Sequence, residues 1–161
     1  MRVSAKTDYA VRAVAELAAS GDERPLKAER IADGQAIPIK FLETILLELK
    51  HAGIVRSQRG QDGGYTLARP AAEISIADVI RAVDGPLANV RGDRPENVSY
   101  QGPAIRLTDV WIAVRAALRD VLETTTLADL VSGELPTAVT ELTGRPDAWV
   151  SLGRIRGSRE P

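Results

Sequence analysis

The chain contains no cysteine and a single histidine, His51, among its 161 residues. Without cysteine it has no thiol nucleophile, no disulfide framework, no Cys/His zinc site and no cysteine-ligated iron–sulfur cluster. His51 is the only histidine available to a catalytic triad, and we expect it on the protein surface near the end of a helix. No phosphate loop or paired acidic site at a useful spacing compensates for these absences, so we expect no enzymatic activity.

Long apolar runs are also missing. No run approaches the roughly 18 apolar residues of a membrane span, and the N-terminus lacks a signal-peptide core. We therefore expect a soluble, cytoplasmic protein with no membrane partner. Apolar residues make up 44% and charged residues 27% of the chain, which is typical of a globular protein.

The net charge is only −1, but it is divided unevenly along the chain. Residues 1–69 hold 11 Lys/Arg against 9 Asp/Glu, a balance of +2, and residues 70–161 hold 10 against 13, a balance of −3. All lysines lie in the first part. The small positive excess has the sign expected if the N-terminal half faces a polyanion.

Three helices are predicted in the first fifty residues. Apolar residues recur at helical spacing over residues 9–18, with Thr7 as the candidate cap. A short helix is predicted over residues 28–35. Pro38 is well placed as the first residue of a third helix, whose apolar stripe has the spacing i, i+3, i+4, i+7. That stripe consists of Leu42, Ile45, Leu46 and Leu49.

The pattern then changes to that of a β-hairpin. Residues 54–58 and 65–68 are typical of two short strands around a glycine-rich tip. Ser75 and Asp78 form a capping box for the helix that follows. Short helices joined by a tight turn and followed by a hairpin make the outline of a winged helix-turn-helix. We therefore expect a fold that is mainly α with a small β-hairpin, with the DNA-binding domain at residues 1–85.

The C-terminal half is organised around one long helix. Residues 86–103 are polar and without period, and we expect a flexible loop there. Residues 104–133 hold a long dimerisation helix and a short helix capped by Thr126. We expect residues 134–161 to be a C-terminal extension, partly disordered, with a basic tail at its end. The stripe of the long helix consists of Leu107, Trp111, Val114, Leu118 and Val121.

Four motifs follow one another in register over about residues 1–132. They are Met1-Arg2-Val3-Ser4 with Tyr9-Ala10-Val11, then 37–43 with 49–55, then 59–65, and finally 74–80. Together they resemble the motifs of the IscR/NsrR/CymR-type winged-helix transcription regulators. This resemblance implies a homodimer that binds a partly palindromic operator in double-stranded DNA and usually represses transcription. Many members also read an iron–sulfur or small-molecule signal.

The chain departs from the family pattern at the cluster ligands. Members that carry a cluster bind it through cysteines in the loop before the long helix. When Trp111 is matched to the family's tryptophan, Ile105 and Thr108 stand where a cysteine and a histidine ligand would be. Some members take ligands from the first helix, where Asp8 and Arg12 stand here, and an arginine cannot serve. We therefore expect no metal and no iron–sulfur cofactor.

The resemblance and the geometry of a winged helix give the candidate DNA contacts. Side chains at the start of the recognition helix point at base edges, where Phe41 either touches a thymine methyl or is a core residue. An arginine followed by glycine at the hairpin tip can enter a narrow minor groove. Residues near the start of the first helix resemble positions that touch phosphate. The candidates are Arg2, Ser4, Lys6, Pro38, Lys40, Phe41, Glu43, Thr44, Arg59 and Gly60.

Two further questions stay open from the sequence. The long helix either pairs with its two-fold mate, with Trp111 in that interface, or is buried against its own domain. We expect the first, because the segment after Val121 is too weakly patterned to cover the stripe. The alternative to a simple repressor is a sensor of the same family. Its effector would be a small molecule bound near residues 86–103, or a partner protein.

Overall fold

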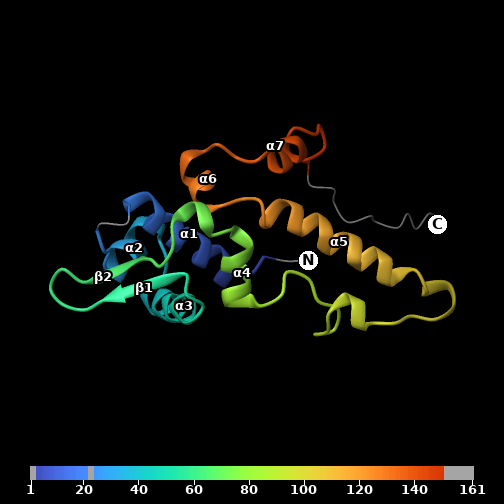
Figure 1. Cartoon of the computed structure of the whole chain (residues 1–161), viewed down its shortest axis with the longest axis horizontal. Helices are drawn as coiled ribbons and strands as arrows, with labels where there is room; N and C mark the ends of the chain where they lie inside the picture. The colour runs from blue at the N-terminus through green and yellow to red at the C-terminus, as the bar shows by residue number, and fades with distance from the viewer. Residues whose placement is uncertain (1–2, 22–23, 151–161) are drawn as a thin grey trace, which may run out of the picture.

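The computed structural model describes residues 3–21 and 24–150 (Figure 1). Within this part the fold is mainly helical with one antiparallel hairpin, as predicted from the sequence. No helix in it is long and apolar enough to cross a membrane. The helices and strands are α1 (Ala5–Ser20), α2 (Ala28–Gln35), α3 (Ile39–His51), β1 (Val55–Gln58), β2 (Gly64–Leu67), α4 (Ile76–Asp84), α5 (Leu107–Leu122), α6 (Leu127–Ser132) and α7 (Thr137–Thr143).

Helix α1 is capped by Ser4 and not by Thr7, which corrects the sequence prediction. The Ser4 Oγ accepts a hydrogen bond from the Thr7 backbone N–H at 3.0 Å, so the helix begins before Thr7. Thr7 is buried, and its hydroxyl donates to Asp84 Oδ2 at 2.6 Å. Serine and threonine are both good N-caps, and the contact between α1 and α4 decides which of the two is used.

The core lies between the first four helices and the hairpin. All residues of the predicted α3 stripe are fully buried. Because they share one side of the helix, the opposite side of α3 faces solvent. Pro38 is the N-cap of α3 and Ile39 its first helical residue, one position later than predicted.

Leu26, which lies outside the hairpin, pairs with β2 and so extends the two-stranded sheet by one residue. Gln58 lies opposite Gly64 in the β1–β2 register. Before α2, the Leu26 N–H donates to the Tyr65 carbonyl at 2.9 Å, and the Tyr65 N–H donates to the Leu26 carbonyl at 2.8 Å. A Cβ at position 64 would lie 2.5 Å from the Leu26 oxygen, so this close approach requires glycine. This pairing of Leu26 with Tyr65 was not predicted from the sequence.

Capping boxes start both α4 and α6. The Asp78 N–H donates to Ser75 Oγ and the Ser75 N–H to Asp78 Oδ2, both at 3.1 Å, as predicted. A second box, led by Thr126, starts α6. The Leu127 N–H donates to the Ile74 carbonyl at 2.9 Å, and Leu127 is fully buried in the core. The short helix that we grouped with α5 thus completes the core of the first domain.

Between α4 and α6 the chain forms an arm that leaves the domain and returns along α5 (Figure 1). Residues 86–103, where we expected an irregular loop, include the 3-10 helix Pro95–Asn97 and the start of a second, Gly102–Ala104. Helix α7 was not predicted, since its short apolar pattern is weak. The basic tail lies outside the described residues.

Candidate nucleic-acid interface

The first turn of α3 presents a solvent-facing set of polar and aromatic side chains. The Lys40 side chain is 89% exposed, and its Nζ lies 3.3 Å from Glu43 Oε2. The Thr44 hydroxyl donates to the Lys40 carbonyl at 3.4 Å. Phe41 is 47% exposed and therefore is not a core residue. This surface offers an ammonium, a hydroxyl, a carboxylate and an aromatic edge to a partner.

Contacts with α1 hold this turn in place. The rings of Phe41 and Tyr9 meet edge to face, with centroids 5.8 Å apart and planes at 83°. The Arg12 guanidinium lies 5.5 Å from the centroid of the Tyr9 ring and pairs with Asp8 at 3.0 Å. Arg12 also donates to the Gln35 carbonyl at the end of α2. Aromatic and cation–π contacts of this kind favour one orientation of α3 against α1.

The hairpin forms a wing that projects from the domain (Figure 1). Arg59 lies exposed at its tip. Gly60 beside it has φ +110°, a conformation that a side chain would strain. Lys50 Nζ donates to Ser57 Oγ at 2.7 Å and so ties the end of α3 to the wing. This role of Lys50 was not predicted from the sequence, because its partner Ser57 lies in another element.

The predicted phosphate contacts near α1 are already engaged within the protomer. The Ser4 hydroxyl donates to Asp84 Oδ2 at 2.5 Å. Lys6 Nζ donates to the Val83 carbonyl at 2.5 Å and pairs with Glu48 at 2.8 Å. These contacts join α1 to α3 and α4, and a phosphate contact by either side chain stays a prediction. Arg2 lies outside the described residues.

Within the described residues, helix α5 has no buried side chain. Its predicted stripe is half-buried, with Val114 40% exposed. Trp111 Nε1 donates to the hydroxyl of Tyr100, in the loop that precedes α5 in the same chain, at 3.1 Å. A neighbouring apolar flank is exposed, with Val110 at 50% and Ala117 open to solvent. The helix is thus not buried against its own domain.

The stripe also borders an apolar cavity of about 560 Å³ beneath α5. Its walls come from α1, α4, the following loop and the inner side of α5. The lining includes Thr7, Ile80, Leu87, Trp111, Leu118 and Val121. The inner side of the helix therefore faces this cavity, and the outer flank faces solvent.

Three comparisons with known proteins agree on the family. The model of the Rrf2 family, described as "Iron-dependent Transcriptional regulator", matches residues 3–133. A protein of Mycobacterium tuberculosis that is named as an HTH-type transcriptional regulator is 52% identical over 142 residues, which is 88% of each chain. The HTH-type transcriptional regulator CymR of Bacillus subtilis is 36% identical over 132 residues, 82% of this chain and 91% of CymR.

Solved structures give the same result. The structure of CymR, the global cysteine regulator of B. subtilis, superposes with a TM-score of 0.71 at 34% identity, over 83% of this chain and 98% of CymR. IscR of T. potens superposes with a TM-score of 0.67 at 31% identity, over 83% of this chain and 88% of IscR. The relatives are transcription regulators, in agreement with the expectation that the chain is not an enzyme.

The donor set of this chain does not fit the iron in the family's description. The sequence contains no cysteine. At the two matched ligand positions, Ile105 has an aliphatic side chain, and the Thr108 hydroxyl donates to the Val98 carbonyl at 2.9 Å. The described residues hold no group of three or more His, Asp or Glu side chains placed to bind a metal. A cysteine-ligated cluster has no ligands here.

The fold, the family match and the relatives lead to one assignment. The winged-helix arrangement and the motifs agree with the predicted resemblance, which is thereby confirmed. The chain belongs to the Rrf2 family of DNA-binding transcription regulators, as a member that lacks cluster-ligating cysteines.

Proposed function

We propose that this protein is a homodimeric repressor that binds a partly palindromic operator without an iron–sulfur cluster. The observation that carries the proposal is the pairing of an exposed first turn of α3 with an arginine-tipped wing in a chain of this family. Because its target is chromosomal DNA, we expect it to act in the cytoplasm.

A second copy of the chain would cover the outer flank of α5. This 16-residue helix has apolar side chains along one side and none that is buried in the described protomer. Apolar surface of this kind is typical of an interaction site. Pairing across a two-fold axis places the same flank of both copies in contact. The long helix is therefore the proposed dimer interface.

The dimer would read two half-sites about one helical turn, roughly 34 Å, apart. The start of α3 would enter the major groove, where Lys40 donates to guanine and Thr44 to either base edge. Phe41, which is exposed, would touch a thymine methyl, and Glu43 would accept from a cytosine amine. Pro38 would begin this turn at the groove.

The wing would supply the second contact in each half-site. Arg59 is exposed at the tip, and Gly60 allows the backbone to approach the DNA closely. A narrow minor groove has an enhanced negative potential that attracts an inserted arginine. The hydrogen bond from Lys50 to Ser57 keeps the wing at a fixed distance from α3.

The test is a titration of operator DNA, taken from the protein's own upstream region, with Lys40→Ala, Arg59→Ala and the double variant. We expect each single change to weaken binding by about 1–3 kcal/mol if it removes a base-reading contact. In vitro transcription from the same fragment then tests repression, which predicts fewer transcripts as protein is added.

Arg145→Ala is the matched control, because it removes one positive charge from an exposed position two residues beyond the end of α7, in a segment outside the proposed DNA contacts. It should bind like the wild type at the same ionic strength. If the double variant also binds like the wild type, the groove contacts are assigned wrongly. If added protein increases transcription, the protein is an activator.

A sensor of the same family is the second candidate. It is favoured by the loop 86–103, whose residues line cavities on two sides of α5. In that case a small molecule or a partner protein would regulate DNA binding by the same surface.

A further inference from the structure

Four arginines from three separate segments converge on one cavity of about 400 Å³. The cavity lies between the end of α4, the loop that follows it and the middle of α5. Arg115 and Arg119 are four residues apart and so share one side of α5, the side next to its apolar stripe. The residues from Gly85 to Ala88 form another wall. The arginines are Arg81, Arg94, Arg115 and Arg119.

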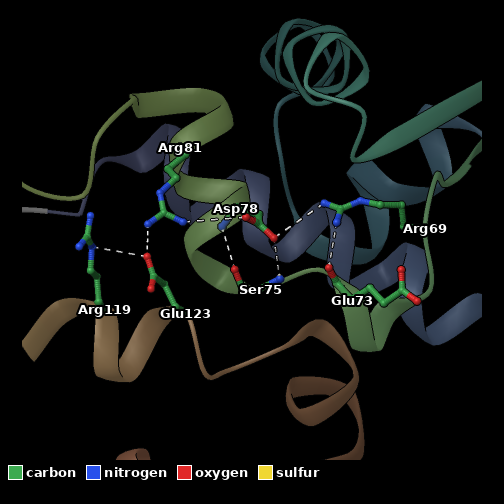
Figure 2. A network of polar contacts seen from close by, with 7 residues as sticks. All are labelled: Arg69, Glu73, Ser75, Asp78, Arg81, Arg119 and Glu123. Carbon is green, nitrogen blue, oxygen red and sulfur yellow. Dashed lines mark hydrogen bonds and ion pairs between the residues drawn. The ribbon is translucent and has the colours of Figure 1, made fainter. Parts of the chain in front are cut away.

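Too few carboxylates face these guanidinium groups to neutralise them. Glu96 is the only acidic residue among those that line the cavity, and it pairs with Arg115. Just outside the cavity, Glu123 is shared between Arg81 and Arg119, as Figure 2 shows.

Asp78 does not remove this positive excess. Its carboxylate lies 3.9 Å from Arg81 and 3.8 Å from a second arginine, Arg69 (Figure 2). When Arg69 and Asp78 are counted with the cavity arginines, Glu96 and Glu123, the cluster holds five guanidinium groups and three carboxylates. The local charge is therefore positive although the whole chain carries −1.

Arg94 and Arg115 have the least balanced surroundings. The Arg115 side chain is only 18% exposed, so its charge is partly withdrawn from water. Within the described residues the Arg94 side chain has neither a hydrogen bond nor an ion pair to the protein. The pKa of the Glu96 carboxyl lies below its ordinary value because its own backbone N–H and the Arg115 guanidinium donate to it, with smaller help from the charge of Arg94.

We propose that this cavity binds a small dianion, which Arg94 of the loop and Arg115 of α5 hold while Arg81 and Arg119 complete the site. A guanidinium group presents a planar fork of N–H donors that matches carboxylate, phosphate and sulfate oxygens. The volume is within the range of small-molecule sites. The ligand class is therefore a compact metabolite with two negative charges.

A ligand in this position would bridge α4, the loop and α5. It would fix the angle between the arm and the DNA-binding domain, and that angle sets the spacing of the two recognition helices in a dimer. The effect on DNA rests on the proposed function, whereas binding of the anion does not. Both can be measured on the same full-length protein.

The first experiment measures thermal unfolding with increasing inorganic phosphate, sulfate, succinate or acetate, against sodium chloride at the same ionic strength. We expect a rise in Tm of about 5–10 °C for a dianion at 100 times its dissociation constant, growing with the logarithm of the dianion concentration. Acetate should give no rise beyond that of sodium chloride. Phosphate and sulfate against succinate then distinguish a tetrahedral oxyanion from a dicarboxylate.

Arg94→Ala is the decisive variant, because it removes a guanidinium group that makes no hydrogen bond or ion pair among the described residues. It should fold like the wild type and bind the dianion at least about tenfold more weakly. Arg106→Ala, at the start of α5, removes the same charge from a position 86% exposed and should leave the affinity unchanged. This control separates the site from the general stabilisation by excluded sulfate and phosphate.

Equal Tm shifts in the wild type and Arg94→Ala, or no shift beyond that of sodium chloride with any of the dianions, would overturn the site. The second experiment repeats the operator titration with the active dianion at constant ionic strength. We expect a changed DNA affinity in the wild type and no change in Arg94→Ala. If the wild-type protein fails to bind DNA at all, the proposed function fails, and the thermal titration still decides the anion site.

Discussion

The winged-helix domain and the α5 arm use their apolar residues in opposite ways. In the domain, the stripe of α3 is fully buried by neighbouring elements of the same chain. In the arm, α5 carries a comparable stripe, and none of its side chains is buried in the described protomer. Since both helices are amphipathic, the difference lies in what covers them. The core of the domain is complete within one chain, whereas the arm leaves apolar side chains of α5 exposed in the described protomer.

The largest expected effect comes from placing charge on the two most exposed large apolar side chains of α5, Val110 on its outer flank and Val114 in its stripe. Val110→Asp with Val114→Asp would bury two unpaired carboxylates in the proposed dimer interface, which is strongly unfavourable. We expect the dimer dissociation constant to rise at least about 1000-fold, and operator binding to fall with it. Analytical ultracentrifugation measures the first quantity and a DNA titration the second.

Ala116→Asp is the control for this change, because Ala116 is exposed on the opposite side of the same helix. It should remain dimeric and bind DNA normally. A dimeric Val110→Asp, Val114→Asp variant would contradict the proposed interface. The exposed apolar side chains of α5 would then need another explanation.

The next effect compares the two stripes directly. Leu46→Ala removes a fully buried side chain from the domain core and should lower the free energy of unfolding by about 2–5 kcal/mol. Leu118→Ala removes a half-buried side chain from α5. Measured in the monomeric Val110→Asp, Val114→Asp variant, the Leu118→Ala change should lower the free energy of unfolding by less than about 1 kcal/mol. Urea denaturation followed by circular dichroism gives both values. Equal losses would mean that the arm is packed as tightly as the domain.

The elements that could be predicted from the sequence are those defined by residues that lie close together in the chain. The capping box of Ser75 and Asp78 needs only four residues, and α4 starts where this box predicts. The apolar stripe of α3 is likewise defined by the spacing of neighbouring residues, and the whole stripe is buried in the structure. The cap of α1 was wrong because Ser4 and Thr7 are equivalent by local rules, and the distant Asp84 decides between them.

The features that sequence missed depend on residues far apart in the chain. The strand pairing of Leu26 with Tyr65 spans the whole helix-turn-helix, so no short window contains it. The arginine cavity joins Arg81 to Arg115, and only the four-residue spacing of Arg115 and Arg119 was visible in advance. Helix α7 was missed for another reason, since its seven residues carry too little apolar pattern to stand out.

The smallest expected effect concerns the joint between the two regions, where α4 ends at Asp84 and the arm begins. The pKa of Asp84 lies below its ordinary value of 3.8, chiefly because the Ser4 and Thr7 hydroxyls donate to the carboxylate, with a smaller contribution from the charge of Lys6. A carboxyl whose pKa is lowered by folding stabilises the folded state above its unfolded pKa, and this stabilisation is lost as the pH falls through the folded pKa. We therefore expect the free energy of unfolding of the wild type to decrease from about pH 5 downward.

Asp84→Asn should be less stable than the wild type at pH 7, and the difference between them should shrink below about pH 4, because the wild type then loses its charged contact as well. Urea denaturation at a series of pH values measures both curves. Glu96 and Asp129, whose pKa values are also lowered, remain in the variant, so the difference between the curves reports Asp84 alone. Parallel curves would show that the contact between α1 and the end of α4 does not depend on the charge of this carboxylate. Converging curves would show that the charged Asp84 side chain holds the start of α1 against the end of α4, next to the point where the arm begins.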